Sequence, residues 1–438
     1  MTTITIEPTF PFRRTTTIHH GAPFPTLLTN ALTTLPTPPT RLYLLISKSL
    51  ATNHPEVLTQ LWDALGERLV GVRVGVTPHT PWEEVVEVAE ECRKLNPDGL
   101  ITLGGGSITD TAKLVALLLA NPSSDGGPYS IPHLFHVFSL PSSALTPAAI
   151  PIISLPTTLS AAEYTPSTGS FSPTGKRKLS HPSLAPKCVL LDPELARLTP
   201  CEVWMQTAAK AVDHCVEVLI LPDSQFPAGG EGDTEGIRAV AGDALKGLVE
   251  AVVREKIIAT SSATPGERDN TSPVSDSNPR EAEYSINVLV LQQTRLTALL
   301  SARHSISALT RTPPIPTGAS HALTHHLATF GILHGTASAI LLPAVCDDSY
   351  PLNSHLQDSV VDILIPTIEG TGMFEGYSRE MGLGELLRRV FTFLDLPGKL
   401  GAVGVGEVVE RVLEKGGVKG VRRLETREEV EGVLQRCA

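Results

Sequence analysis

Residues 41–113 alternate between short apolar runs and amphipathic stretches, and this alternation constrains the fold more than any other feature of the chain. The segments RLYLLIS, LVGVRVGV and DGLITLGGGS are short and rich in branched apolar residues, which is typical of strands. Helices are predicted over Pro55–Leu69 and Pro81–Leu95, and a third follows the last strand as TDTAKLVALLLA. This order of strand and helix predicts a parallel sheet.

The rest of the chain changes from this mixed pattern to a helical one. Another buried strand is predicted at Ala149–Ser160, and CVLLDPELARLTP closes the first half. From Glu202 onward, apolar residues recur at helical spacing. We therefore predict an α/β domain over residues 1–197 and an all-helical domain over residues 198–438. Residues 260–281 have few apolar side chains and many Ser, Pro, Asn and Asp, which predicts a disordered insertion.

Composition limits the partners of this protein. Of its 438 residues, 41% are hydrophobic and 18% are charged, which is typical of a globular chain with a sizeable core. A formal net charge of −11 argues against nucleic acid or an anionic membrane as partner. The chain shows neither an apolar signal core nor a run long enough to span a membrane, and its six cysteines are scattered. We predict a cytoplasmic protein.

Three consecutive glycines stand between a predicted strand and a predicted helix, in GGGSITDTAK. Glycine lets the backbone approach a ligand closely, and the free N–H groups at a helix start face an anion. The turn is therefore suited to phosphate, with a purely structural turn as the alternative. The pattern is not GxGxxG, so the ordinary dinucleotide fingerprint does not apply.

Histidines gather in the helical half of the chain. Four of them fall within the stretch SHALTHHLATFGILHG, namely His321, His325, His326 and His334. Upstream, His214 follows Lys210 by four residues, so the two side chains share one helix face. Asp213 lies about 100° around the helix and does not share that face. Such a cluster predicts a catalytic site rather than scattered core histidines.

These motifs together resemble the iron-containing (group III) alcohol dehydrogenase family, and its maleylacetate reductase branch most closely. The resemblance is carried by GGGSITDTAK, LPTTLSAAEYTP, DPELARLTP, KAVDHCVEVL and HGTASAILLPAV. It implies a dinucleotide-binding α/β domain followed by a helical domain, the architecture of dehydroquinate synthase, with the active site in the cleft. It also implies a homodimer. The first fifty residues, the insertion and the C-terminus match less well.

The resemblance implies that NADH or NADPH is the cofactor. Where many NAD-using relatives place Asp, at the end of the first strand, this chain has Ser47 and Lys48, and neither repels the 2′-phosphate of NADP. Asp110 and Lys113 complete the glycine motif. The residues expected to bind the cofactor are Gly104, Gly105, Gly106, Ser107, Thr157, Thr158, Ser160 and Ser47.

In the metal-binding relatives, an Asp stands at the position of Lys210. A protonated lysine repels a nearby cation and cannot ligate it, so we expect neither iron nor zinc to be bound. If a metal were bound, the resemblance gives its ligands as His214, His321 and His334, with Asp213 or water replacing the missing carboxylate. We predict instead that the Lys210 ammonium occupies the place of the metal and acts on a substrate oxygen.

The predicted function is that of an NAD(P)H-dependent reductase that resembles maleylacetate reductase, an enzyme of aromatic compound catabolism. Hydride would pass to an unsaturated or keto acid, with His325 as proton donor and Arg177 as a possible carboxylate ligand. The expected catalytic residues are Lys210, His214, His321, His325, His334 and Tyr164. Two alternatives remain at this point: a metal-dependent alcohol dehydrogenase, and a non-catalytic relative that binds the cofactor. A lyase like dehydroquinate synthase would need lysines and arginines that this sequence lacks.

Overall fold

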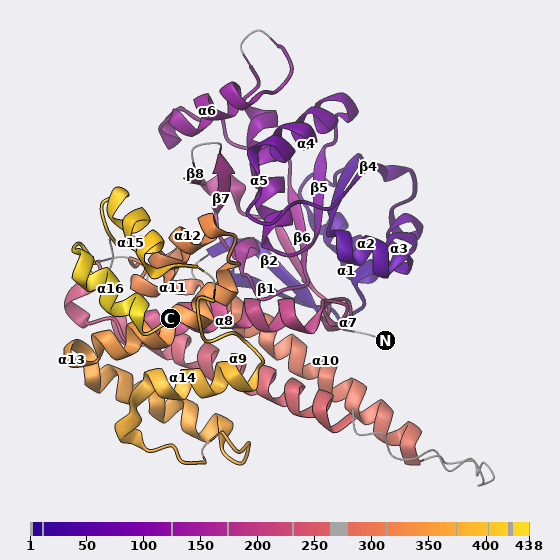
Figure 1. Cartoon of the computed structure of the whole chain (residues 1–438). Helices are drawn as coiled ribbons and strands as arrows, with labels where there is room; N and C mark the ends of the chain where they lie inside the picture. Colours follow the sequence, from indigo (N-terminus) through magenta and orange to yellow (C-terminus); the bar gives the residue numbers. More distant parts are fainter. Residues whose placement is uncertain are drawn as a thin grey trace.

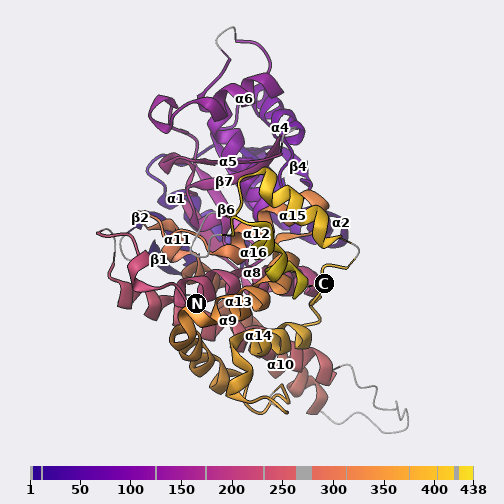
Figure 2. The ribbon, with the colours of Figure 1, turned by 60° about the vertical axis from the view of Figure 1, so that its left-hand side comes forward.

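The chain folds into an α/β part and a helical part, which lie side by side in the computed structural model (Figures 1 and 2). The structure describes residues 3–10, 13–123, 126–172, 175–229, 232–262, 279–311, 313–373, 375–401, 403–418 and 424–437. Residues 263–278, the greater part of the predicted insertion, lie outside the described residues. Its two ends are helical and belong to α9 (Thr234–Ser262) and α10 (Pro279–Ser305).

A seven-stranded sheet forms the centre of the α/β part, as the strand and helix pattern predicts. Six neighbouring strands are parallel, and only the edge strand β1 runs antiparallel, against β2. In spatial order the strands are β1 (Thr5–Phe10), β2 (Arg13–His20), β9 (Cys188–Leu191), β6 (Ile152–Pro156), β5 (Gly99–Gly104), β3 (Leu42–Ile46) and β4 (Leu69–Val74). The predicted strands are thus confirmed, with shorter bounds for most of them.

Helices cover both faces of this sheet because side chains alternate along each strand. On β3, Leu42, Leu44 and Ile46 pack in the cluster that includes α1 (Phe24–Thr34) and α3 (Pro55–Leu65). Tyr43 and Leu45 lie in the cluster on the opposite face, formed with α4 (Trp82–Leu95), α5 (Gly106–Ala120) and α6 (Ile131–Ser139). The helix predicted over Pro55–Leu69 ends earlier than expected, because Gly66 has a φ of 54° and a 3-10 turn follows.

The strand order creates one favoured place for a ligand. Strands β3 and β5 are neighbours, and the chain runs from β3 to β4 on one side of them and from β5 to β6 on the other. Open parallel sheets bind ligands outside the carboxyl ends of their strands at such a point. Ser47 follows β3 and Gly105 follows β5, and the Ser47 N–H donates a hydrogen bond to the Leu103 carbonyl at 2.9 Å.

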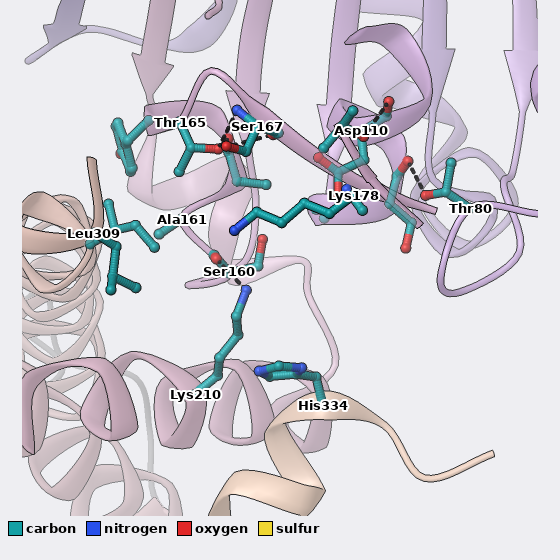
Figure 3. A pocket seen from close by; sticks show the side chains of 18 of the residues that line it. Thr80, Asp110, Ser160, Ala161, Thr165, Ser167, Lys178, Lys210, Leu309 and His334 are labelled. Carbon is teal, nitrogen blue, oxygen red and sulfur yellow. Dashed lines mark hydrogen bonds between the residues drawn. The ribbon is translucent and has the colours of Figure 1, made fainter. Parts of the chain in front are cut away.

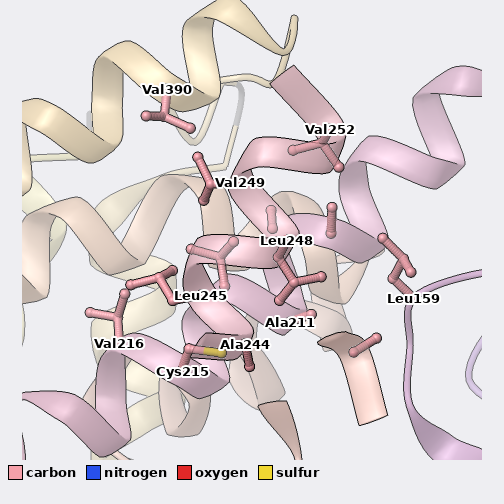
Figure 4. Close-up of a cluster of buried hydrophobic side chains, with 14 of the residues drawn as sticks. Leu159, Ala211, Cys215, Val216, Ala244, Leu245, Leu248, Val249, Val252 and Val390 are labelled. Atoms are coloured by element: carbon pink, nitrogen blue, oxygen red, sulfur yellow. The ribbon is translucent and has the colours of Figure 1, made fainter. Parts of the chain in front are cut away.

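The helical part is built around α8 (Cys201–Leu219), most of whose residues are buried. Ala211, Cys215 and Val216 of α8 pack against α9, and Val390 of α14 (Gly382–Phe393) closes the same core (Figure 4). The helices that follow include α12 (Ala319–Leu327), α13 (His334–Ile368), α15 (Val405–Glu414) and α16 (Arg427–Gln435). In the described part of the chain, no helix combines the length and apolarity needed to cross a membrane.

The connection between the two parts is short. Strand β9 ends at Leu191, and α7 (Pro193–Arg197) leads into α8. The boundary after residue 197 stays a prediction. A hairpin of β7 (Ser167–Ser172) and β8 (Gly175–Ser180), which the sequence patterns do not predict, lies beside α5 on the α/β part and above α12 in Figure 1.

Candidate active site

One large cavity, of about 1340 Å³, lies between the α/β part and the helical part. Its α/β wall consists of the turn before α5, the loop after β6 and the β7–β8 hairpin. Its helical wall consists of one face of α8, α12 and the first turn of α13. Lys178 of the hairpin and Lys210 of α8 approach the same space from opposite walls (Figure 3).

The glycine turn forms the start of α5 and faces this cavity. No side chain caps the helix, so its first N–H groups are available to an anion. A Cβ at Gly106 would lie 2.5 Å from Ser160 Oγ, so a side chain there would displace this hydroxyl of the second loop. Gly105, Gly106 and Ser107 line the cavity. These residues fit the pyrophosphate of a dinucleotide.

The loop after β6 supplies hydroxyl groups at the same place. Thr158 and Ser160 line the cavity, and among the described residues neither buried hydroxyl has a hydrogen-bond partner. Thr157 and Gly104 are not among the lining residues. The Thr157 N–H donates to the Gly104 carbonyl at 3.1 Å, and the Thr157 carbonyl accepts from Thr199 Oγ1 at 2.7 Å. Gly104 and Thr157 therefore connect the carboxyl ends of β5 and β6 through a backbone hydrogen bond.

Ser47 and Lys48 line the far end of the cavity, beyond the glycine turn. Ser47 precedes α2 (Lys48–Asn53), so the Lys48 ammonium is carried by the first residue of a helix. Of the described residues that line the cavity, Asp110 is the one carboxylate. No carboxylate therefore stands where it would repel a 2′-phosphate.

Lys113 of the glycine motif does not line the cavity. Its side chain is fully buried, and its Nζ donates to the carbonyls of Ala162 and Ser167, both at 2.7 Å. The Asp110 carboxylate lies 3.6 Å away. Lys113 thus fixes the loop after β6 to α5, and its role is to position that loop.

Four histidine rings from three helices meet at the helical wall. His214 comes from α8, His321 and His325 are one turn apart on α12, and His334 is the first residue of α13. His321 is the centre of the group: its ring centroid lies 5.1, 5.0 and 4.8 Å from those of His214, His325 and His334. The structure therefore brings together the four histidines expected to be catalytic, whereas the neighbouring His326 is not among the residues that line the cavity.

Burial makes these imidazoles neutral. It is the main cause that holds the pKa of each of the four well below 6.5, and nearby lysines lower these pKa values further. His325, predicted from the sequence as the proton donor, is therefore neutral in this structure and has no acidic proton of its own at neutral pH. Both ring nitrogens of His214 and the Nδ1 of His321 are buried without a partner among the described residues. Neutral imidazoles of this kind can bond a substrate oxygen.

Lys210 lies one helical turn before His214 and points into the cavity beside His334 (Figure 3). Its Nζ donates to the Ser160 carbonyl at 2.9 Å, which connects α8 to the loop after β6. Burial lowers the pKa of Lys210, and Asp110 and Glu163 oppose that effect. The ammonium is thus placed between the predicted cofactor loop and the histidines.

Two lysines of the β7–β8 hairpin complete the site, and sequence reasoning missed both. Lys176 Nζ lies 2.6 Å from His325 Nδ1, across the two parts of the molecule. Burial, with Lys210 adding to it, lowers the pKa of Lys176 to about 8. Lys178 lies two residues after Lys176 on β8, so both side chains are on the same face of the strand. Arg177, between them, lies with Cζ 5.6 Å from the centroid of the Phe135 ring. In the sequence run GKRKLS the two lysines stand two positions apart, which is the spacing that puts both on one face of a strand.

Glu217 is a third residue that the sequence did not reveal. Its carboxylate accepts hydrogen bonds from the Gly318 and His321 N–H groups, both at 2.9 Å. Glu217 therefore holds the start of α12, and with it His321, against α8. Tyr164 lines the cavity, but its ring is 4% exposed and packs in the main core cluster.

The lysines around the histidine cluster disfavour a divalent metal, because an ammonium repels a nearby cation. Across the described ranges, no three His, Cys, Asp or Glu side chains are grouped as metal ligands. Asp213, the nearest candidate to replace the missing carboxylate, accepts a hydrogen bond from Ser338 Oγ at 2.7 Å. Burial raises its pKa to about 7. The cluster instead contains the Lys210 ammonium, and Lys176 lies next to it.

Comparison with known proteins agrees with the fold. The model of the family described as iron-containing alcohol dehydrogenase matches residues 28–193. Dehydrogenase ALT3 of Alternaria alternata is 30% identical over 369 residues, which cover 82% of this chain and 84% of that protein. A maleylacetate reductase of Burkholderia cepacia is 30% identical over 176 residues, covering 40% of this chain and 42% of that protein.

Solved structures show the same fold. The crystal structure of maleylacetate reductase from Rhizobium sp. strain MTP-10005 superposes with a TM-score of 0.65 at 20% identity, covering 100% of this chain and 98% of that one. The matching family model and the similarity to a dehydrogenase over most of the chain identify an oxidoreductase. The chain belongs to the iron-containing alcohol dehydrogenase family.

Proposed function

We propose that this protein is an NAD(P)H-dependent reductase that transfers hydride to an unsaturated or keto acid without a bound metal, as a relative of maleylacetate reductase. One observation carries this proposal: the half-buried Lys210 side chain, with Nζ 2.9 Å from the Ser160 carbonyl, stands where metal-binding relatives have a carboxylate. The positive charge that polarises the substrate then comes from the Lys210 side chain and not from a metal ion.

The residues around Lys210 suit this chemistry. When bound, the reduced nicotinamide supplies a hydride to the substrate carbon. The electron pair of the reduced double bond moves onto oxygen, where the Lys210 ammonium and the neutral imidazoles of His214 and His334 stabilise it by hydrogen bonds. The Lys176 ammonium, 2.6 Å from His325 Nδ1, is the proposed source of the proton that completes the product. His325 would relay it, accepting the Lys176 proton at Nδ1 while its Nε2–H gives a proton to the substrate.

The charge of the cavity favours an anionic substrate. Lys176, Lys178 and Lys210 line it, with Asp110 as their one carboxylate neighbour in the described lining. A carboxylic acid is ionised at neutral pH and would be attracted to this wall. The assay that tests the function mixes the protein with NADPH or NADH and maleylacetate. Oxidation of the cofactor supports the proposal, whereas activity confined to NAD⁺ and a simple alcohol contradicts it.

The KM for maleylacetate is expected to rise as the pH passes about 8, because Lys176, whose pKa burial lowers to about 8, is cationic only below that value. Above it, the rise should approach tenfold per pH unit. The charged and titratable side chains that face Lys176 are those of Lys210, Asp110, Lys178, His325 and His79. KM is measured between pH 6.5 and 9.5.

Lys176→Arg is the matched control, because guanidinium keeps its charge throughout this range. Its KM should stay level where that of the wild type rises. An identical rise in both proteins would show that another group controls binding.

A further inference from the structure

The loop between β4 and α4 contains two consecutive residues in a backbone conformation that side chains disfavour. His79 has a φ of 70° and Thr80 a φ of 57°, although neither is glycine. Thr80 is β-branched, which makes the left-handed region especially unfavourable for it. Such strain persists only where the surrounding structure imposes it, and it is concentrated at ligand sites.

Hydrogen bonds to two neighbouring elements hold this loop in place. The His79 N–H donates to Ser107 Oγ at 3.2 Å, and Thr80 Oγ1 donates to the Ser107 carbonyl at 3.3 Å. On the other side, the Phe171 N–H of β7 donates to the Thr80 carbonyl at 3.2 Å. The strained loop is therefore fixed to the first turn of α5, next to the glycine turn.

This arrangement places the His79 imidazole at the cavity. The ring contacts Phe171, with centroids 5.2 Å apart, and lines the cavity together with Ser107. Its Nε2 is buried and has no hydrogen-bond partner among the described residues. Burial, with Lys176 adding to it, lowers the pKa of His79, so the ring is neutral at pH 7. Thr80 of the same loop lies at the edge of the site (Figure 3).

We propose that His79 is a ligand of the cofactor pyrophosphate, with its Nε2–H donating a hydrogen bond to a phosphate oxygen. Two residues flank the first turn of α5. Ser160 lies next to Gly106, and His79 lies next to Ser107, so the phosphate site between them is bordered on both sides. The nicotinamide end must extend toward Lys210 and the histidine cluster, which leaves the pyrophosphate beside His79. This inference rests on the proposed function, because it requires a bound dinucleotide.

Three variants test the proposal in the full-length protein. His79→Ala removes the donor, and His79→Gln restores an N–H donor at a similar reach. His136→Ala is the control, because His136 is exposed on α6 in the same part of the molecule and is not among the lining residues. The dissociation constants of NADPH, NADH and ADP-ribose are measured for each by calorimetric titration. ADP-ribose has the pyrophosphate but lacks nicotinamide.

We expect His79→Ala to weaken binding of both the tighter-binding coenzyme and ADP-ribose by about tenfold or more, since the lost bond goes to a charged group. His79→Gln should recover part of that loss, and His136→Ala should bind like the wild type. Thermal unfolding of each variant confirms that it is folded.

Three results would overturn the proposal. If His79→Ala binds ADP-ribose as well as the wild type but binds the coenzymes less tightly, the contact is to the nicotinamide end. If it binds all three ligands as well as the wild type, His79 does not touch the cofactor, and the proposed function is unaffected. If the wild type binds neither coenzyme, the proposed function itself fails.

Discussion

Replacing Lys210 with methionine is expected to lower kcat/KM for maleylacetate reduction by about 10²- to 10³-fold, the loss typical of removing one group that stabilises a developing oxyanion. Methionine keeps most of the length of the side chain, so the cavity wall is preserved while the ammonium is lost. The hydrogen bond to the Ser160 carbonyl is lost with it. Steady-state kinetics with saturating NADPH or NADH measure the effect.

Lys246→Met controls for the chemical change, because Lys246 is exposed on α9 and lies outside the cavity. This variant should keep full activity. Lys210→Asp adds a second test, since it recreates the carboxylate of the metal-binding relatives. Its activity is expected to appear only with added iron or zinc. Unchanged kcat/KM in Lys210→Met would mean that Lys210 takes no part in the chemistry.

Gly335→Ala is expected to lower the free energy of unfolding by about 3 kcal/mol or more. A Cβ at Gly335 would lie 1.9 Å from the Gln206 carbonyl oxygen, and this backbone atom cannot rotate away. The helices α8 and α13 must separate, which also moves His334 away from the other histidines. Chemical unfolding of the two proteins gives the difference, and the residual activity of the folded variant should fall as well.

Gly406→Ala is a closely matched control, because Gly406 is also the second residue of its helix, α15. A Cβ there meets no heavy atom within 4 Å. This variant should be as stable as the wild type or more stable by about 0.5–1 kcal/mol, since alanine favours the helix. If Gly335→Ala behaves in the same way, the close contact of α8 and α13 is not as described.

Local patterns explain the parts of the fold and the site that the sequence predicts. Strands such as Leu42–Ile46 and helices such as Trp82–Leu95 have a periodicity that their own residues determine. The four-residue spacing of Lys210 and His214 places both on the cavity face of α8. Asp213 lies about 100° around the same helix and accepts a hydrogen bond from Ser338 Oγ instead, as its position predicts.

Long-range pairing explains what the sequence does not predict. Strand β8 is short and polar, so no apolar alternation marks it, and Lys176 meets His325 across 149 positions of the chain. The carboxylate of Glu217 caps α12, about a hundred residues away, and no local signal identifies its partner. The strained loop at His79 depends on contacts with Ser107 and Phe171, which only the assembled fold supplies.

The metal content of the active protein tests the central claim most directly. The purified protein is analysed for bound metals by mass spectrometry, and its oxidation of NADPH and NADH with maleylacetate is followed with and without EDTA. We expect turnover that resists the chelator, with iron and zinc present only in substoichiometric amounts. Stoichiometric iron or zinc together with activity that EDTA abolishes would contradict the role of Lys210 and indicate a metal-dependent dehydrogenase.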